Sequence, residues 1–334
     1  MSDMLTMTPE EVTDLITGAL MRSRTSPENA ASVARALLAA ELAGQSGHGL
    51  RRVEAYSAQA RAGKVDGFAV PSSESLRPGA LAIDAANGFA YPAMDLALDW
   101  LPGAAKTQGI AIAGIRRSHH CGVAGVIVEA LAERGVAALM VANAPAAMAP
   151  WGGRRPLFGT DPIAFAAPLP GSDPVVVDIS LSKVARGKIM AAAQKGEPIP
   201  EGWALDPDGE PTTDAKAAMA GTMIPLGDAK GTALALMVEL LCAGLTGANY
   251  AWQQTSFFDD KGDPPGTGQA IIAIDPDAFG PGGAERMAMM ADMVAGTEGA
   301  RLPGRRRQQI RADFLTNGIP VNADLMESIR AIGT

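Results

Sequence analysis

All three histidines of the chain lie in two short segments that contain glycine. His48 stands between Gly47 and Gly49, which leave the backbone open to a ligand, and Arg52 follows four residues later. If a helix begins at Gly49, the two side chains converge near its first turn. An imidazole exchanges protons near neutral pH, and a guanidinium binds a carboxylate through paired hydrogen bonds. The pair indicates a small carboxylic acid substrate whose reacting atom exchanges a proton; the alternative is a solvated His and Arg at a helix start.

The other two histidines, His119 and His120, follow an apolar run at residues 110–115 that is typical of a strand. Ligands of α/β proteins gather at the carboxyl ends of strands, and the helix predicted to follow presents free N–H groups that suit a phosphate. The alternative is a polar loop in which one His caps the strand. We expect Cys121, the next residue, to be a buried and unreactive thiol because no neighbouring residue type would activate it.

Phosphate-binding fingerprints are missing: no G-x-G-x-x-G follows a strand, and the chain has no P-loop. Three other glycine clusters, at residues 151–155, 227–231 and 303–307, place cationic side chains beside flexible backbone. Such clusters suit an anionic ligand such as a dinucleotide, or are surface turns on a basic face. The residues alone thus predict an enzyme that acts on a small carboxylic acid and binds an anionic cofactor. They do not indicate whether the reaction is a redox reaction.

Composition narrows the class of protein. The chain has 334 residues, 47% of them hydrophobic, and a net charge of −8. An acidic chain does not attract a polyanion, so we expect no nucleic-acid partner. We expect no membrane span, because no apolar run approaches about 18 residues, and no signal peptide at the acidic N-terminus. Two cysteines and three histidines predict reduced thiols, a cytoplasmic location and no metal site.

Periodicity predicts an α/β protein. Thr8-Pro9-Glu10-Glu11 forms a capping box, Ser26-Pro27 begins a second helix that runs to about Ala43, and a third spans residues 50–62 with Gly63 to end it. Residues 64–80 are expected to be a connection. Strands are predicted at residues 110–115, 136–142, 163–167, 175–179 and 270–274, and helices at 123–133, at 230–245 and from 284 onward. We therefore expect a helical domain from both chain ends (residues 1–75 and 284–334) around an inserted α/β domain (residues 76–283).

At these motifs the chain resembles the malate/L-lactate dehydrogenase family of NAD(P)-dependent oxidoreductases. The matching stretches are Ser46-Gly47-His48-Gly49-Leu50-Arg51-Arg52, Ser118-His119-His120, Ala149-Pro150-Trp151-Gly152-Gly153, residues 159–166, 200–204 and 211–214, Lys230-Gly231, residues 237–241 and Leu302-Pro303-Gly304. They cover nearly the whole chain in the same order. The resemblance implies a non-Rossmann fold with a mixed-sheet cofactor domain and a helical domain, and a homodimer with active sites near the subunit interface.

Within the family, residues 118–120, 156–160, 230–234, 237–246 and 250–252 resemble the Δ1-piperideine-2-carboxylate/Δ1-pyrroline-2-carboxylate reductases. That implies reduction of a cyclic imine acid to L-proline or L-pipecolate, with NADPH favoured and NADH possible. The resemblance makes His48 the proton donor, with Ser46 a possible partner, Arg52 the carboxylate clamp and Thr160 a substrate contact. The residues it implies for the cofactor are His120, Cys121, Gly122, Val123, Ala124, Asp178, Ile179, Ser180, Ala229, Lys230, Pro303, Gly304, Arg305, Arg306 and Arg307.

Three positions depart from the reductase pattern. Gly47 stands where the reductases have Ser, Lys188 where they have an Asp of a proposed proton relay, and Ala229 where many members have His or Tyr. Two further hypotheses therefore stay open beside ketimine reduction. One is a 2-hydroxy acid dehydrogenase of malate, lactate or a related acid, and the other is a non-catalytic ligand-binding homologue.

Overall fold

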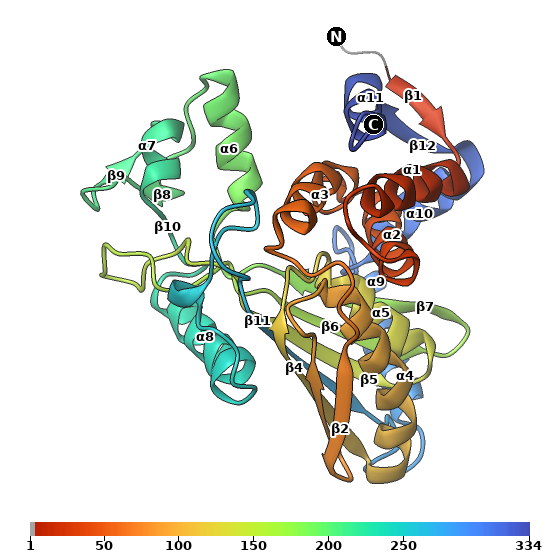
Figure 1. The fold of residues 1–334 in the computed structure, drawn as a ribbon. Helices are drawn as coiled ribbons and strands as arrows, with labels where there is room; N and C mark the ends of the chain where they lie inside the picture. Colours follow the sequence, from red (N-terminus) through yellow and green to blue (C-terminus); the bar gives the residue numbers. More distant parts are fainter. Residues whose placement is uncertain (1–3) are drawn as a thin grey trace.

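The computed structural model describes residues 4–334, which form a mixed α/β fold around a seven-stranded sheet (Figure 1). In spatial order its strands are β2 (Ser72–Arg77), β3 (Ala80–Asp84), β4 (Ile110–Ser118), β11 (Thr267–Ile274), β5 (Ala137–Ala142), β6 (Ile163–Leu169) and β7 (Ser172–Ile179). Only β3 and β4 pair in parallel; the other neighbours are antiparallel. The mixed sheet confirms the expected departure from the parallel Rossmann arrangement.

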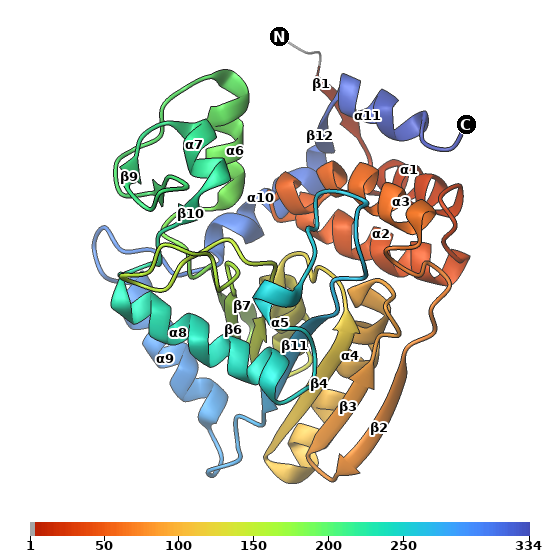
Figure 2. The same cartoon turned by 60° about the vertical axis from the view of Figure 1, so that its left-hand side comes forward.

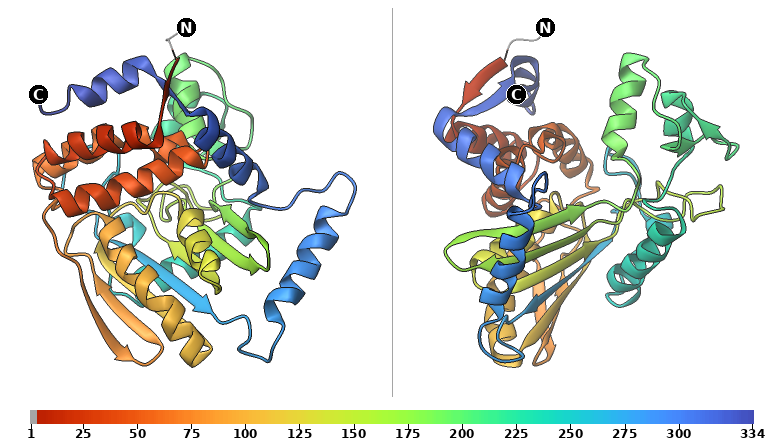
Figure 3. Two further views of the ribbon diagram at one scale, coloured as in Figure 1. Left: turned by 90° about the vertical axis from the view of Figure 1, so that its right-hand side faces the viewer. Right: turned by 180° about the vertical axis from the view of Figure 1, so that it is seen from behind.

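Helices cover both faces of this sheet (Figures 1 and 3). On one face, α4 (Ala90–Gln108) and α5 (Ala124–Glu133) pack against β4, β5 and β6, with fully buried Leu101 and Leu131 in the main core. On the other face lies α8 (Ala229–Glu239), which continues as a π-helical turn, Leu240–Gly244, against β11. α9 (Gly283–Ala295) contacts β6. Four successive antiparallel pairings separate β4 from β7, so the carboxyl ends of these two strands lie at the same end of the sheet.

The two ends of the chain pack together. Strand β1 (Met4–Met7) pairs antiparallel with β12 (Ile319–Asn322). Around them lie α1 (Pro9–Met21), α2 (Pro27–Leu42), α3 (Val53–Ala62), α10 (Arg305–Asn317) and α11 (Ala323–Arg330) (Figure 3). The capping box at Thr8, the Ser26 cap and the left-handed Gly63 that ends α3 are all confirmed. The division of the chain into domains at residues 75 and 284 stays a prediction.

Three local predictions were wrong. The expected connection at residues 64–80 contains β2, in which all six residues are exposed, so no apolar alternation marks it as a strand. The segment from residue 284 onward, expected to be helical, also contains β12. This strand forms because it pairs with β1 from the other end of the chain. The long helix at 230–245 is α-helical only to Glu239, since its last part widens into the π turn.

A smaller lobe projects beside the sheet and shares an apolar cluster with α8, β5 and β11. It contains α6 (Arg186–Lys195), α7 (Ala215–Ala220) and a three-stranded sheet of β8 (Ala204–Leu205), β9 (Pro211–Thr212) and β10 (Thr222–Met223). Its apolar residues form a cluster separate from the main core, with Met148, Leu181 and Ile189 fully buried or nearly so. None of the helices within residues 4–334 is both long and apolar enough to cross a bilayer.

Candidate active site

His48 and Arg52 lie on two short 3₁₀ turns, Ser46–His48 and Leu50–Arg52, that lead into α3. A helix therefore does not begin at Gly49 as the sequence suggested. The Glu41 carboxylate accepts the Leu50 N–H at 2.6 Å and packs against Gly49, where a Cβ atom would collide with it. The buried end of α2 thus determines the shape of the turn that carries both side chains.

The His48 imidazole is neutral at physiological pH. Burial, followed by the positive charge of Arg52, lowers its pKa from 6.5 to about 4. Its ring stacks on His120 with centroids 5.2 Å apart, and its Nδ1 is buried without a hydrogen-bond partner. One ring nitrogen of a neutral imidazole carries no proton, so the group is in the form that accepts one.

His120 is held by a pair of tyrosines that sequence reasoning missed. Its Nδ1 lies 2.6 Å from the Tyr56 hydroxyl, which in turn lies 3.1 Å from the Tyr91 hydroxyl. Burial raises the pKa of Tyr56 to about 12 and depresses the pKa of His120 well below its usual value, so both groups are neutral. Tyr56 stands four residues after Arg52, a helical spacing from which it could have been found.

His119 and Cys121, on either side of His120, are also buried and uncharged. Burial, followed by the charges of Lys64 and Arg52, lowers the pKa of His119 to about 3, and both its ring nitrogens lack a partner among residues 4–334. Burial raises the pKa of the Cys121 thiol to about 12. Cys121 is therefore a buried and unreactive thiol, as expected.

The Arg52 guanidinium keeps its terminal nitrogens available. Its Nε donates to the Gly47 carbonyl at 2.9 Å, and the group lies over the Phe258 ring, 4.6 Å from the centroid. Within residues 4–334 no hydrogen bond engages either Nη atom. The Gly47 carbonyl and the Phe258 ring thus orient Arg52, and its two terminal nitrogens are free to bind a carboxylate.

A cavity of about 560 Å³ gathers six of the residues expected at the cofactor, namely Asp178, Ile179, Pro303, Gly304, Arg306 and Arg307. It extends to residues 43–45, directly before the His48 turn. The Asp178 carboxylate accepts the Gly125 N–H at 3.0 Å in the first turn of α5. The Arg307 guanidinium lies against the same glycine, and its Nη1 is buried without a partner. Because the Asp178 carboxylate already occupies this helix N-terminus, the Arg307 guanidinium is the group that fits an anion such as a cofactor phosphate.

Other expected site residues lie outside this cavity. The Arg305 guanidinium turns to the Ser172 hydroxyl at 3.1 Å and Asp173 at 3.8 Å. Ala229 and Lys230 are exposed at the start of α8, and Ser46 is exposed without a side-chain hydrogen bond to His48. Thr160 binds Leu181 through its carbonyl, beside Ser180. The functional roles of these residues stay predictions, as do those of Gly122, Val123 and Ala124 before α5.

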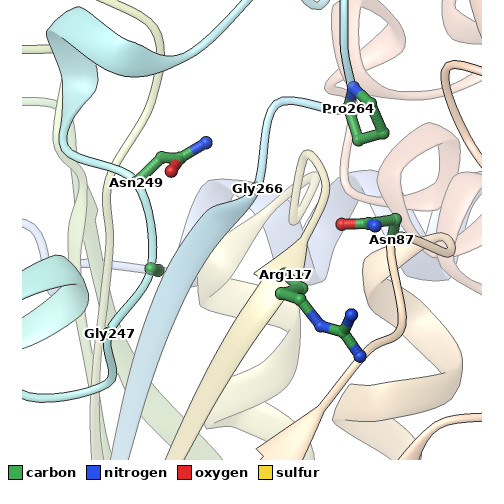
Figure 4. A pocket seen from close by; sticks show the side chains of 7 residues that line it. Asn87, Arg117, Gly247, Asn249, Pro264 and Gly266 are labelled. Atoms are coloured by element: carbon green, nitrogen blue, oxygen red, sulfur yellow. The ribbon is translucent and has the colours of Figure 1, made fainter.

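A second cavity of about 230 Å³ lies near the ends of β4 and β11 and contains none of the expected site residues (Figure 4). It is lined by Asn87, Arg117, Gly247, Ala248, Asn249, Pro264 and Gly266. The Arg117 guanidinium is bound to Asp84 at 2.8 Å and is half exposed. No group of His, Cys, Asp and Glu within the described part of the chain has the arrangement of a metal site.

Comparison with known proteins decides the family. The profile of the family described as Malate/L-lactate dehydrogenase matches residues 7–330. The chain belongs to this family. As a member it is an oxidoreductase that uses a nicotinamide cofactor.

Relatives within the family differ in substrate. The chain is 51% identical over 280 residues to "(2R)-3-sulfolactate dehydrogenase (NADP(+))" of Chromohalobacter salexigens, covering 84% of each chain. It is 39% identical to the "Delta(1)-pyrroline-2-carboxylate/Delta(1)-piperideine-2-carboxylate reductase" of Pseudomonas syringae pv. tomato, covering 96% of this chain and 94% of that one. A crystal structure of delta1-piperideine-2-carboxylate reductase from the same organism superposes with a TM-score of 0.93 at 37% identity, over 98% and 99% of the chains.

This family member also buries two carboxyl groups near Thr160. Asp161 is fully buried, and burial together with Glu239 raises its pKa well above its usual value. Burial raises the pKa of Glu239 from 4.5 to about 7, although its Oε2 accepts hydrogen bonds from Asn143 and the Ala251 N–H, each at 3.2 Å. The folded protein thus binds a proton at Glu239 over a pH range in which the unfolded chain has released it.

Replacing Glu239 with glutamine is expected to raise the melting temperature at pH 8 more than at pH 5. Because the folded pKa is the higher one, wild-type stability is lost as pH rises from about 4.5 through about 7, and the uncharged amide avoids that loss. Thermal unfolding of both proteins at a series of pH values measures the difference. Glu201→Gln, at an exposed position, is the matched control. Parallel curves for wild type and Glu239→Gln contradict a buried ionisation at this position.

Proposed function

We propose that the chain is an NADP-dependent dehydrogenase of a small 2-hydroxy acid, with (2R)-3-sulfolactate as the first substrate to test. The observation that carries the proposal is the neutral, buried His48 imidazole beside the free terminal nitrogens of Arg52. The uncharged imidazole is the form that accepts a hydroxyl proton, and the Arg52 nitrogens suit the carboxylate of the same acid. The choice of a 2-hydroxy acid over an imine is supported by the 51% identity to a sulfolactate dehydrogenase, and by Gly47 and Lys188 in place of the reductase relay.

In this mechanism Arg52 binds the substrate carboxylate and orients the adjacent C2 carbon. His48 accepts the proton of the C2 hydroxyl as that carbon becomes a carbonyl. The cofactor, when bound, supplies the acceptor for the hydride that leaves C2. His120, fixed by Tyr56, supports the His48 ring by stacking. Arg306 and Arg307 would hold the anionic part of the cofactor in the 560 Å³ cavity, and the Asp178 carboxylate would accept a hydrogen bond from a neutral donor group of the cofactor.

Reduction of a cyclic imine acid is the second candidate. It is supported by the superposition on the piperideine-2-carboxylate reductase and by the relatives of similar name at 38–39% identity. The experiment that separates the two follows nicotinamide absorbance with purified protein. NADP⁺ is paired with sulfolactate, malate or lactate, and NADPH with pyrroline-2-carboxylate or piperideine-2-carboxylate. Turnover of imines but of no hydroxy acid overturns the first proposal. Cofactor binding with no turnover on the whole panel favours a non-catalytic homologue.

Arg307→Gln is expected to weaken NADPH binding roughly tenfold, because a buried charged hydrogen-bond donor to an anion is lost. Fluorescence titration with NADPH measures the dissociation constant, and titration with NADH shows whether the change is specific to the extra phosphate. Arg305→Gln is the matched comparison, with a smaller effect expected because its guanidinium lies on Ser172 and Asp173. Equal losses in both variants contradict the placement of the phosphate at Arg307.

We propose that the protein is a homodimer, as the family resemblance implies. Helix α8 and the turn after it expose Leu236, Met237 and Leu240, an apolar surface that a second copy would cover. The mass of the particle in solution, measured by light scattering after size exclusion, tests the proposal. A mass of one chain at micromolar concentration contradicts it.

A further inference from the structure

Residues 254–263, here called the strap, join the turn Ala251–Gln253 to β11 and cross to α3 before they return to the sheet (Figure 2). The strap has no helix or strand of its own. What attaches it to α3 therefore decides where its side chains lie.

One buried lysine makes most of that attachment. Lys64, two residues after the end of α3, has a side chain that is only 1% exposed. Its Nζ donates to the Ser256 carbonyl at 2.7 Å and to the Asp259 carbonyl at 3.0 Å, and it lies 3.4 Å from the Asp259 carboxylate. Gln59 on α3 adds a hydrogen bond to the same Asp259 carbonyl at 2.9 Å. A buried ammonium needs such partners, so Lys64 and the strap backbone depend on each other.

Between these two anchored carbonyls the strap carries two phenylalanines that contact the site. The Phe257 ring is buried, with its centroid 5.3 Å from that of His119 and 5.1 Å from that of His120. Phe258 lies on the guanidinium of Arg52. The strap thus contacts both the histidine pair and the carboxylate clamp, whereas none of its residues lines the 560 Å³ cofactor cavity.

We propose that Lys64 is a positioning residue of the active site: by clamping the strap to α3 it sets Phe257 against His119 and His120 and Phe258 on Arg52, and so keeps the substrate end of the site ready to bind. Only the expected change in KM rests on the proposed function, because the position of the strap can be measured without a substrate. If the clamp is lost and the strap is correctly placed for only a tenth of the time, the apparent substrate affinity falls about tenfold.

The test compares Lys64→Met, which keeps an unbranched stem but removes the ammonium, with Lys64→Arg, which keeps a charge. Lys261→Met, an exposed lysine of the same strap, is the matched control. The rate of hydrogen exchange at the strap amides shows whether the strap is held to α3, and this measurement does not depend on catalytic turnover. In Lys64→Met we expect faster exchange in residues 256–261, KM raised about tenfold, a smaller change in kcat and unchanged NADPH affinity. Lys64→Arg should recover part of both effects.

Unchanged strap exchange in Lys64→Met overturns the clamp whatever the substrate proves to be. Faster exchange with unchanged KM overturns its role in substrate binding. If Lys64→Met does not fold, Phe258→Ala decides instead, because Phe258 is half exposed. There we expect normal strap exchange and KM raised about two- to fivefold from the lost cation–π contact. An unchanged KM in Phe258→Ala overturns the proposal.

Discussion

Replacing His48 with alanine is expected to lower kcat by ~10²–10⁴ and to leave NADPH affinity unchanged, because the variant loses the group that accepts the substrate proton. Steady-state kinetics on the substrate identified by the panel, with fluorescence titration of NADPH, measures both quantities. His48→Gln keeps a polar side chain of similar size but no base, and should be as slow. Glu54→Ala, at an exposed position of α3, is the matched control, and Ser46→Ala tests separately whether Ser46 is a partner of His48. Near-normal kcat in His48→Ala would mean that another group moves the proton.

The same assignment predicts a pH profile. A general base must be deprotonated, and burial lowers the pKa of His48 to about 4. For the free enzyme, kcat/KM for oxidation should therefore stay level from pH 7 to pH 5 and fall only as pH approaches about 4. An inflection near 6.5, the value of an ordinary imidazole, contradicts a buried base at this position.

Replacing Arg52 with alanine is expected to raise KM by about 10- to 150-fold, which corresponds to the 1.5–3 kcal/mol of a charged hydrogen bond. Arg52→Lys should recover only part of this loss, since an ammonium has no planar fork for a carboxylate. KM for the acid and kcat measured side by side separate lost binding from lost chemistry. Arg51→Ala, at the exposed neighbouring position, is the matched control. Equal KM values for Arg52→Ala and wild type would place the carboxylate elsewhere.

Neighbours along the chain explain which structural predictions succeeded. The Thr8 capping box, the Ser26 cap and Gly63 are decided within one helical turn, and all three are found where the sequence placed them. The apolar runs at residues 110–115, 136–142 and 270–274 became adjacent strands β4, β5 and β11 because each is buried in the same sheet. Strand β2 has no such signal, since all its residues are exposed and only pairing with β3 makes it a strand.

Most local elements, the family and the two residues whose types and spacing suit a small acid, His48 and Arg52, could be read from the sequence. The groups that surround these two residues depend on tertiary packing. Tyr56 meets His120 across 64 residues of chain, and Lys64 meets the Ser256 carbonyl across 192. Contacts of that separation leave no periodicity in a sequence, because they depend on how the completed sheet and helices pack. The same packing removes water from His48, and that burial sets its charge.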